Sequence, residues 1–393
     1  NGSIHYICMD WRHLRELLAA SADNYTEFKQ LVVWNKDNAG MGAFYRSKHE
    51  MIAVFKNGTG KHINNFGLGE NGRYRTNVWQ YRGVNTLKAG RMDELTLHPT
   101  VKPVAMIVDP SETTRARRML GGAVELYEHP LGEFWLRDSG PTFVHDADGR
   151  LAAVDWIFNG WGGADWASPT SDNALAAFIA GLAGVPVIRS LLVNEGGGIH
   201  VDGEGTVLLT QTVQLDPGRN PLADRARIEA EMARTLGARK AIWLPRGLTR
   251  DYDTFGTRGH VDIVATFPAP GRVLVHDQRN PDHPDHLVSA EVRAILSQET
   301  DAQGRALEVI PLPAPEAQTD AHGFVDYSYV NHLVCNSGVI ACAFGELAAD
   351  SRAAAILAEA YPGRRVVPVD ARPLFARGGG IHCITQQQPR ARG

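Results

Sequence analysis

The chain has 393 residues, of which 44% are hydrophobic and 21% charged, a balance typical of a globular, soluble protein. A single hydrophobic core rarely extends beyond about 250–300 residues, so we expect two units or one large repetitive domain. The apolar run 174–188 contains Gly181, Gly184 and Pro186. It is also shorter than the roughly 20 residues that a membrane-spanning helix needs, so we expect no span. No basic segment followed by an apolar one opens the sequence, so we expect no export signal.

The chain has four cysteines: Cys8, Cys335, Cys342 and Cys383. They lack the paired spacing of zinc sites or disulfide frameworks, so we expect no metal, a reducing cytoplasmic setting and a free thiol at Cys383. Residues 1–109 carry 14 Lys and Arg against 10 Asp and Glu, a net +4, which leaves −8 for residues 110–393 of a chain at −4. A basic first part on an acidic remainder suggests two origins and two kinds of partner.

The first part, residues 1–103, is rich in polar loops and aromatic residues. Basic and aromatic side chains are interleaved, for example at 44–48, 73–75 and 79–82. Such a pattern can follow a phosphate backbone and stack on bases, which predicts weak nucleic-acid contact. An ordinary mixed surface has a similar composition and remains the alternative.

Residues 9–13, 34–36 and 98–103 together resemble a middle slice of the DNA amino-group methyltransferases. The run 98–103 is similar to the motif that these enzymes place before their S-adenosylmethionine loop. No Asp-Pro-Pro-Tyr motif occurs, however, and no glycine-rich loop follows Pro103. The resemblance therefore implies an α/β fragment that is not competent for methyl transfer by itself.

From residue 104 onward the pattern becomes that of an α/β domain, which we place at 104–393. The apolar run 104–108 predicts a buried strand, Ser111 is a candidate cap for the helix that follows, and 124–127 predicts a second strand. The later predicted elements are a helix to about Ala183 capped by residues 171–173, a hairpin turn at 202–205, a strand at 327–334, a helix at 350–360 and a strand at 366–370, with Pro368 favouring a sheet edge.

Two carboxylates stand beside breaks in this pattern. Asp138 lies between an apolar strand end and Gly140, and Glu195 precedes three glycines. A loop residue in such a position is often directed at a ligand. For Asp138 the alternative is a local ion pair with Arg137 at a strand end.

His260 and Asp262 follow Gly259 and precede a hydrophobic run. In a strand these two residues would share a face, so their side chains would point together. A lone histidine is usually structural, whereas this pairing favours a functional role.

Three glycines at 378–380 precede an apolar run that presents Cys383. If 381–385 is a strand, His382 and Cys383 point to opposite faces, so His382 cannot easily serve as the base for the thiol. The alternative is a buried, inert cysteine in the core.

The pentapeptide at 196–200 recurs at 378–382. The polar residues Asp138, Glu195, His260 and Cys383 are separated by 57, 65 and 123 positions, and His322 lies near the middle of the longest interval. A module of roughly 60 residues repeated five times is therefore suggested, with each module placing one loop at a common centre. Chance spacing is the alternative.

A cysteine, a histidine and three carboxylates without a metal pattern suit nucleophilic catalysis on a cation. Asp138 and Asp262 could each accept paired N–H bonds from a planar guanidinium. Cys383 would attack the guanidinium carbon, and His260 would protonate the departing ammonia and later activate water. Glu195 would orient His260.

At these residues the sequence resembles the agmatine deiminases and bacterial peptidylarginine deiminases of the guanidine-modifying superfamily. The resemblance covers about 103–389 through five runs: 134–141, 195–203, 219–221, 259–262 and 381–389. It implies a five-module pseudosymmetric α/β propeller (a pentein), no cofactor, and conversion of agmatine to N-carbamoylputrescine and ammonia. Peptidylarginine and free arginine are the alternative substrates.

The resemblance also implies roles for individual residues. Cys383 becomes the nucleophile, His260 the acid and base, and the supporting carboxylates are Asp138, Glu195 and Asp262. The expected substrate-binding residues are Asp138, Asp262, Trp135, Arg137 and Gly380. Gly380 stands where the family often has asparagine, and Arg258 stands where it often has an acidic residue.

The family opens with a strand and a helix that complete its first module, and here the methyltransferase-like part takes that place. We therefore expect a fusion whose first module is incomplete. A missing strand would leave an open sheet edge, which invites pairing with a partner or a second copy of the chain. A nucleic-acid-binding protein with an inactive body is the second hypothesis.

Overall fold

The structure is a computed structural model that describes residues 2–9, 11–35, 48–61, 76–80, 104–120 and 124–390. The chain divides into two units, Asn1–Leu95 and Thr96–Gly393. The methyltransferase-like run 98–103 lies outside the described residues. Within the described part of the chain, no helix has the length and apolar character needed to cross a membrane.

The first unit contains a four-stranded sheet of order β1-β3-β2-β4, with strand β3 antiparallel to both β1 and β2. Its elements are β1 (Ser3–Met9), α1 (Leu14–Ser21), β2 (Glu27–Asn35), β3 (His49–Asn57) and β4 (Val78–Gln80). Val32, Ile52 and Val54 form its buried cluster. The expectation that this part is rich in polar loops is wrong for residues 27–35 and 49–57, which form strands because they contain β-branched and aromatic residues such as Val32 and Phe55.

Four three-stranded sheets of the second unit share one topology. In each, an antiparallel hairpin is followed by a helix, and the third strand pairs in parallel with the second. Their elements in chain order are β7 (Thr142–His145), β8 (Leu151–Ile157), α6 (Leu175–Ala183) and β9 (Val187–Val193); β10 (Ile199–Val201), β11 (Thr206–Thr210), α8 (Arg225–Leu236) and β12 (Lys240–Leu244); β13 (Ala265–Ala269), β14 (Arg272–Asp277), α9 (Asp285–Leu296) and β15 (Glu308–Pro313); β18 (Leu333–Val334), β19 (Gly338–Ala343), α10 (Leu347–Ala360) and β20 (Arg365–Asp370).

A fifth sheet has two strands among the described residues. β5 (Ala105–Val108) and β6 (Glu125–Glu128) pair in parallel and are joined by α3 (Thr113–Leu120). This sheet therefore repeats the second and third strands of the other four. The remaining short elements are α4 (Leu136–Ser139), α5 (Gly160–Gly163), η1 (Asp172–Ala174), η2 (Gly196–Gly198), α7 (Gln211–Gln214), η3 (Thr249–Tyr252), η4 (Val261–Ile263), β16 (Thr319–Asp320), β17 (Gly323–Phe324) and α11 (Arg372–Phe375).

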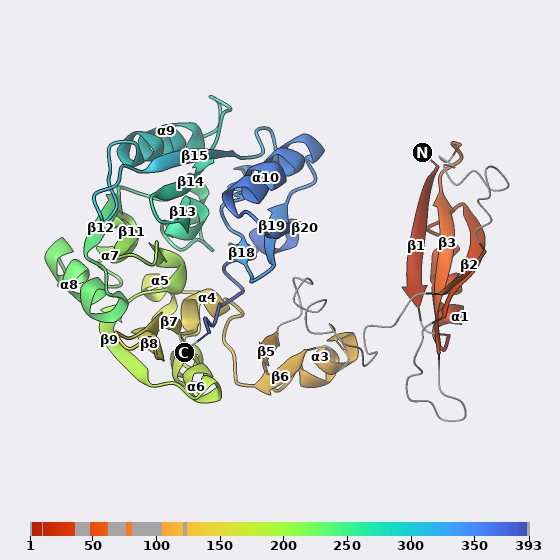
Figure 1. Ribbon diagram of the computed structural model, residues 1–393, viewed down its shortest axis with the longest axis horizontal. Coiled ribbons are helices and arrows are strands. Elements are labelled where there is room, and N and C mark those ends of the chain that lie inside the picture. The colour runs from red at the N-terminus through yellow and green to blue at the C-terminus, as the bar shows by residue number, and fades with distance from the viewer. Residues whose placement is uncertain are drawn as a thin grey trace. The chain divides into compact units, whose positions relative to one another are not determined.

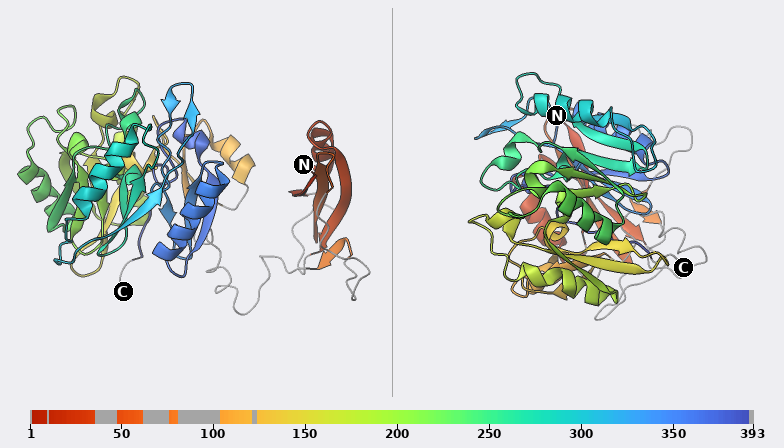
Figure 2. Two further views of the ribbon diagram at one scale, coloured as in Figure 1. Left: turned by 90° about the horizontal axis from the view of Figure 1, so that it is seen from above. Right: turned by 90° about the vertical axis from the view of Figure 1, so that its left-hand side faces the viewer.

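The four sheets follow one another around the second unit, with helices α6, α8, α9 and α10 on the outside and the short α4 and α5 near the middle (Figure 1). The side views show the same layering of helix over sheet (Figure 2). Each long helix buries one apolar stripe, as Val288, Val292 and Leu296 of α9 do. Short irregular segments lie at the inner ends of the sheets (Figure 1).

The bounds of the strands predicted at 104–108, 124–127 and 366–370 are confirmed within one or two residues, and so is the end of the helix at Ala183. The prediction of a strand at 327–334 is wrong except at Leu333 and Val334, and the helix predicted from 350 begins at Leu347. The first predicted strand is not buried throughout, since Val104 and Met106 are exposed.

Helix α6 ends where Gly184 adopts a left-handed φ of 66°, a conformation that glycine tolerates. Asp202 accepts the amide N–H groups of Glu204 and Thr206 in the predicted hairpin turn. Pro368 lies in β20, which pairs only with β19 in the described structure and so forms an edge.

The predicted helix caps are wrong. Helix α3 begins at Thr113, and the Ser111 hydroxyl donates instead to Asp109 Oδ1 over 2.6 Å. Asp172 accepts the amides of Gly132 and Glu133, so it ties a loop in place rather than capping a helix. Short polar side chains bond to any nearby orphan amide, and the tertiary structure decides which.

Candidate active site

Short turns, rather than strands, carry the candidate residues. Asp138 lies in the single helical turn α4, Glu195 directly precedes η2, and His260 precedes η4, which contains Asp262. Cys383 lies in a turn at 381–384. The assumption of strands is therefore wrong at His260 and Cys383, because these segments bend where each sheet ends, whereas Asp138 was expected outside a strand. A turn lets neighbouring side chains converge, which alternation along a strand would prevent.

His260 lies between two carboxylates. Its Nε2 is 3.3 Å from Glu195 Oε2 and its Nδ1 is 3.8 Å from Asp138 Oδ1, and all three side chains are buried. Burial alone would lower the pKa of His260, but Asp138, Glu195 and Asp262 outweigh it and raise the pKa to about 9. The imidazole is therefore protonated at neutral pH.

Glu195 is held by Arg219, a residue that the sequence pattern did not single out for a role. Arg219 Nε lies 2.9 and 3.0 Å from the two carboxylate oxygens, and its other nitrogens bond Asp216 and the Thr257 carbonyl. Burial opposes ionisation of Glu195, yet Arg219 and His260 together lower its pKa. The carboxylate therefore stays charged although it is fully buried.

Asp138 accepts one hydrogen bond on each oxygen. The amide of Gly197 donates to Oδ1 over 3.0 Å, and the indole Nε1 of Trp161 donates to Oδ2 over 2.9 Å. A Cβ at position 197 would lie 2.5 Å from His260 Nδ1, so only glycine fits there. Burial is the main reason that the pKa of Asp138 is raised, to about 6.

Asp262 has one crowded oxygen and one free oxygen. Oδ2 accepts from His382 Nδ1 at 2.7 Å, Asn331 Nδ2 at 3.2 Å and the Cys383 thiol at 3.5 Å. Oδ1 is buried and has no hydrogen-bond partner among the described residues. Burial opposes its charge, but His382, with help from His260 and Arg137, lowers the pKa of Asp262.

Cys383 is buried beside this carboxylate. Burial, followed by the charges of Asp262 and Asp138, raises the pKa of the thiol well above its usual value, while a Gly380 amide and the Asn331 side chain act in the opposite direction. His382 and Cys383 both reach Asp262, so the expectation that they point to opposite faces is wrong. His382 bonds the carboxylate, and burial lowers its pKa, so it stays neutral.

The three further residues expected to bind substrate surround the sulfur. Trp135 packs against Cys383 in an apolar cluster with Phe158 and Trp161. Arg137 donates to the His382 carbonyl and to Gln387, and the expected alternative of a local ion pair with Asp138 is wrong for the described structure. A Cβ on Gly380 would lie 2.4 Å from Asn331 Oδ1. The predicted substrate contacts of Trp135, Arg137 and Gly380 stay predictions.

The repeat spacing pointed to the wrong residue in the fourth interval. His322 lies in the exposed turn between β16 and β17. Asn331 takes the expected place, because its side chain contacts both Cys383 and Asp262. The sequence carries little signal for Asn331, because the segment 327–334 is predicted as one strand but is paired only at Leu333 and Val334.

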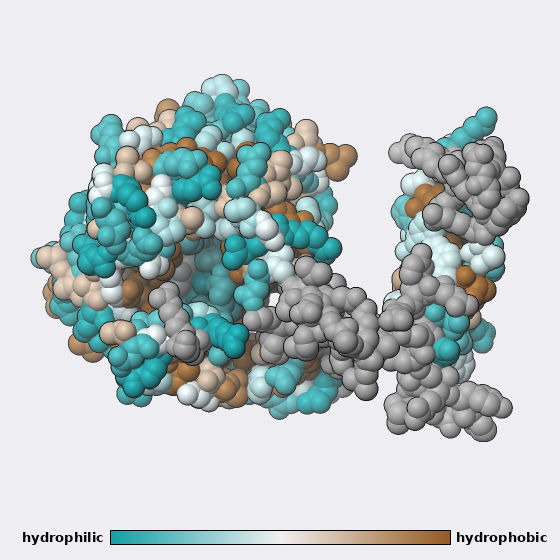
Figure 3. All heavy atoms as spheres, in the orientation of Figure 1, coloured by the Kyte–Doolittle hydropathy of each residue, from teal (hydrophilic) through white to brown (hydrophobic). Residues whose placement is uncertain are grey.

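Within the described part of the chain, no group of three or more His, Cys, Asp and Glu side chains could hold a metal ion. The face seen in Figure 3 is largely hydrophilic and is hollowed near the middle of the second unit. A buried thiol, a protonated imidazole and three carboxylates, set where repeated α/β sheets end, suit chemistry on a cationic, planar group. Fold and site together define an α/β enzyme that acts on guanidino groups.

Comparison with known proteins places the chain within this class. Residues 89–389 match the model of the Porphyromonas-type peptidyl-arginine deiminase family, so the chain belongs to that family, which confirms the resemblance seen in the sequence. It is 57% identical over 290 residues to a Streptomyces coelicolor protein named "Putative agmatine deiminase", covering 74% of this chain and 85% of that one.

Two further relatives agree with this assignment. The agmatine deiminase of Medicago truncatula is 37% identical over 319 residues, covering 73% of this chain and 84% of the plant protein. The solved structure of the Enterococcus faecalis agmatine deiminase superposes with a TM-score of 0.69 at 32% identity, covering 74% of this chain and 84% of that chain. The family match leaves residues 1–88 outside it.

Proposed function

We propose that this protein is an agmatine deiminase, which hydrolyses agmatine to N-carbamoylputrescine and ammonia. The names of its relatives support this substrate. One observation in the site carries the proposal. Asp262 Oδ1 is a buried carboxylate oxygen without a donor among the described residues, and Oδ2 of the same carboxylate lies 3.5 Å from the thiol. Such an atom is costly unless a donor reaches it, and a guanidinium presents N–H groups in one plane.

The reaction proceeds in two halves. Asp138 and Asp262 hold the guanidinium, and its positive charge lowers the pKa of the Cys383 thiol, which releases its proton to solvent as the substrate binds. The thiolate attacks the guanidinium carbon, the C–N bond breaks, and His260 donates a proton so that ammonia leaves. A covalent thiouronium remains. His260 then takes a proton from water, the resulting hydroxide attacks the same carbon, and the C–S bond breaks to give the ureido product and the thiolate.

A neighbouring cavity supports a cationic substrate tail. The cavity has a volume of about 560 Å³ and is bordered by Gly378, by the carboxylates of Asp251, Asp253 and Asp326, and by Arg250, whose guanidinium pairs with Asp320. Asp326 is half-buried, and burial, with the nearby charges of Asp251 and Asp285, raises its pKa to about 7. A cation relieves this repulsion, so the ammonium end of agmatine suits the cavity better than the neutral backbone of peptidylarginine or the carboxylate of arginine.

We also propose the domain arrangement that goes with this function. Residues 104–393 form the catalytic domain, and the β5-β6 sheet and the four three-stranded sheets are the five modules of one α/β propeller. The first module lacks the opening strand of its hairpin among the described residues. The common topology of the other four sheets and the relation of β5 and β6 to their last two strands support this reading.

The remaining partners stay predictions. The basic first part is expected to contact nucleic acid weakly, the chain to form a homo-oligomer, and the protein to work in the cytoplasm. Gel retardation of duplex DNA by the intact protein at low and high salt tests the first of these. Salt-sensitive retardation supports contact, and its absence at low salt contradicts it.

Ammonia release from agmatine tests the proposed function. The intact protein should release one ammonia for each N-carbamoylputrescine, and Cys383→Ser should release none. When the reaction is quenched during turnover, mass spectrometry should find the covalent adduct on the peptide that contains Cys383. Undiminished ammonia release by Cys383→Ser would end the proposal, as would the absence of any release from agmatine by the folded protein.

A further inference from the structure

We propose that Asn331 is a catalytic residue, whose side-chain amide donates a hydrogen bond to the sulfur of Cys383 and so stabilises the thiolate that attacks the substrate. The inference rests on the proposed cysteine mechanism and names a group that supports its nucleophile. Asn331 Nδ2 lies 3.2 Å from Cys383 Sγ, and the asparagine is completely buried.

The orientation of the Asn331 amide is fixed by its other contacts. Oδ1 accepts the backbone N–H of His382 over 2.9 Å, and a backbone N–H can only donate. The nitrogen must therefore point away from that amide, toward the sulfur and toward Asp262 Oδ2, which lies 3.2 Å away. Because an ionised carboxylate only accepts, both neighbours of Asn331 require the same orientation.

The surroundings of the sulfur make this donor important. Asp262 and Asp138 place negative charge near Cys383, and burial excludes water, so a thiolate there is costly. Among the described residues, the Asn331 side chain donates to the sulfur, the Gly380 backbone also lowers the pKa of the thiol, and the buried Arg137 guanidinium interacts with it electrostatically. A neutral amide can stabilise the thiolate without repelling a bound guanidinium, which a lysine or arginine in the same place would do.

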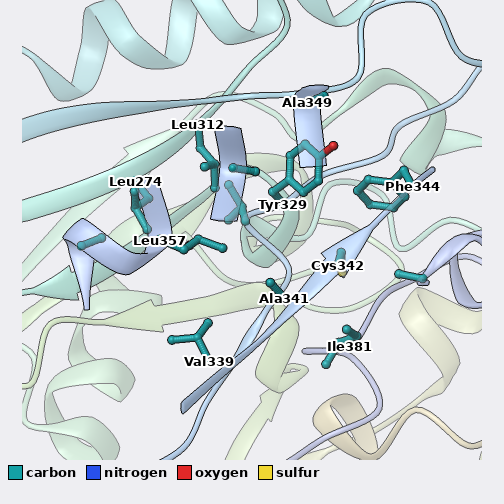
Figure 4. Close-up of a cluster of buried hydrophobic side chains, with 14 of the residues drawn as sticks. Leu274, Leu312, Tyr329, Val339, Ala341, Cys342, Phe344, Ala349, Leu357 and Ile381 are labelled. Atoms are coloured by element: carbon teal, nitrogen blue, oxygen red, sulfur yellow. The ribbon is translucent and has the colours of Figure 1, made fainter. Parts of the chain in front are cut away.

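One hydrophobic cluster positions both residues. Tyr329 and Val330, which precede Asn331, pack in the same cluster as Ile381, which precedes His382 and Cys383. Figure 4 shows Tyr329, Ile381 and Cys342 within this cluster. Cys342 donates its thiol to the Asn331 carbonyl over 2.9 Å. The distance between the amide and the sulfur is therefore set by the core of the last sheet rather than by a mobile loop.

Two substitutions of Asn331 separate the hydrogen bond that it donates to the sulfur from the one that it accepts from the His382 amide. Asn331→Leu removes both the donor and the acceptor at similar volume. Asn331→Asp keeps an oxygen for the His382 amide and removes the donor to sulfur. The probe is iodoacetamide, and mass spectrometry follows alkylation of the Cys383 peptide from pH 6 to 10.5. The half-exposed Cys335 serves as an internal reference.

We expect both variants to move the midpoint of Cys383 alkylation upward by about one pH unit, so that the rate at pH 8 falls about tenfold. Turnover of agmatine should fall at least tenfold. The control is Cys335 in the same variants, whose alkylation midpoint should stay unchanged.

A loosened structure would have the opposite effect on the alkylation rate, because a more accessible thiol is alkylated faster. An unchanged midpoint, or faster alkylation at every pH, in a variant that still melts cooperatively would overturn the proposal. Since alkylation needs no substrate, this experiment stands apart from the proposed function. If the wild type itself does not turn over agmatine while the Asn331 variants still shift the alkylation midpoint, agmatine is rejected as the substrate and the role of Asn331 is supported.

Discussion

The two sides of the site stabilise their central groups by different means. On the imidazole side, His260 is surrounded by formal charges, those of Asp138, Glu195 and, behind Glu195, Arg219. On the sulfur side, Cys383 is contacted by neutral donors, the Asn331 amide and the Gly380 backbone. The consequence is that the pKa of His260 and the pKa of Cys383 are both raised, so both groups hold their protons at rest.

This difference explains why a cation is needed to start the reaction. The imidazole side already carries the proton that departing ammonia requires. On the sulfur side the buried Arg137 guanidinium interacts with Cys383 and Asp262, yet the pKa of the thiol stays raised. In the proposed mechanism a substrate guanidinium bound between Asp138 and Asp262 adds the positive charge that the thiol needs to ionise. A neutral substrate would leave the thiol protonated. The comparison therefore predicts that changes on the imidazole side alter chemistry and stability, whereas changes beside the sulfur alter thiol reactivity.

Replacing the imidazole should have the largest effect. His260→Gln removes the group that protonates ammonia and activates water, and we expect kcat to fall by about 10²–10⁴-fold. Steady-state ammonia release measures this loss. Alkylation of Cys383 by iodoacetamide should persist, since the donors on the sulfur side are intact. A fall of less than tenfold would show that the two sides are not divided in this way.

The buried cation behind Glu195 should have the next largest effect. Arg219→Met leaves Glu195 and Asp216 without their partner, and removing one member of a buried ion pair costs about 3–5 kcal/mol of unfolding free energy. Urea denaturation measures it. The matched control is Arg258→Met, because Arg258 pairs with the same Asp216 but its side chain is 47% exposed, so it should cost less than about 1 kcal/mol. Equal losses in the two variants would contradict the comparison.

The sequence showed the charged groups of this site better than the neutral ones. Cys383, His260 and Glu195 stand beside glycines or strand ends, a local pattern visible in one chain, and the repeat of 196–200 at 378–382 indicated modular sheets. Asn331 has no such neighbours, and its role depends on contacts with residues more than 50 positions away. The assumption of strands at His260 and Cys383 failed for a similar reason, since tertiary packing bends these segments into turns.

The raised pKa of His260 should also appear in stability. A histidine whose folded pKa is about 9, against about 6.5 when unfolded, stabilises the fold fully below pH 6.5 and loses this contribution as the pH rises through 9. The contribution is at most about 3 kcal/mol. The difference in unfolding free energy between the wild type and His260→Gln should therefore shrink between pH 6 and pH 9.5. A difference that stays constant, or grows with pH, would contradict the charged imidazole.

The smallest predicted effect concerns a single indole bond on the imidazole side. Trp161 has an unusual positive φ of 54° and aims its Nε1 at Asp138 Oδ2. Trp161→Phe removes that donor, and the free energy of unfolding should fall by about 1–2 kcal/mol. The pKa of Asp138 should rise, and guanidinium binding should weaken. We expect KM for agmatine to rise about tenfold and the acid limb of the pH profile to move upward. Trp166 stacks on Trp161, and its indole nitrogen has no partner among the described residues, so Trp166→Phe removes an N–H without breaking a bond. If Trp166→Phe raises KM as much as Trp161→Phe does, ring packing rather than the bond to Asp138 supports this carboxylate.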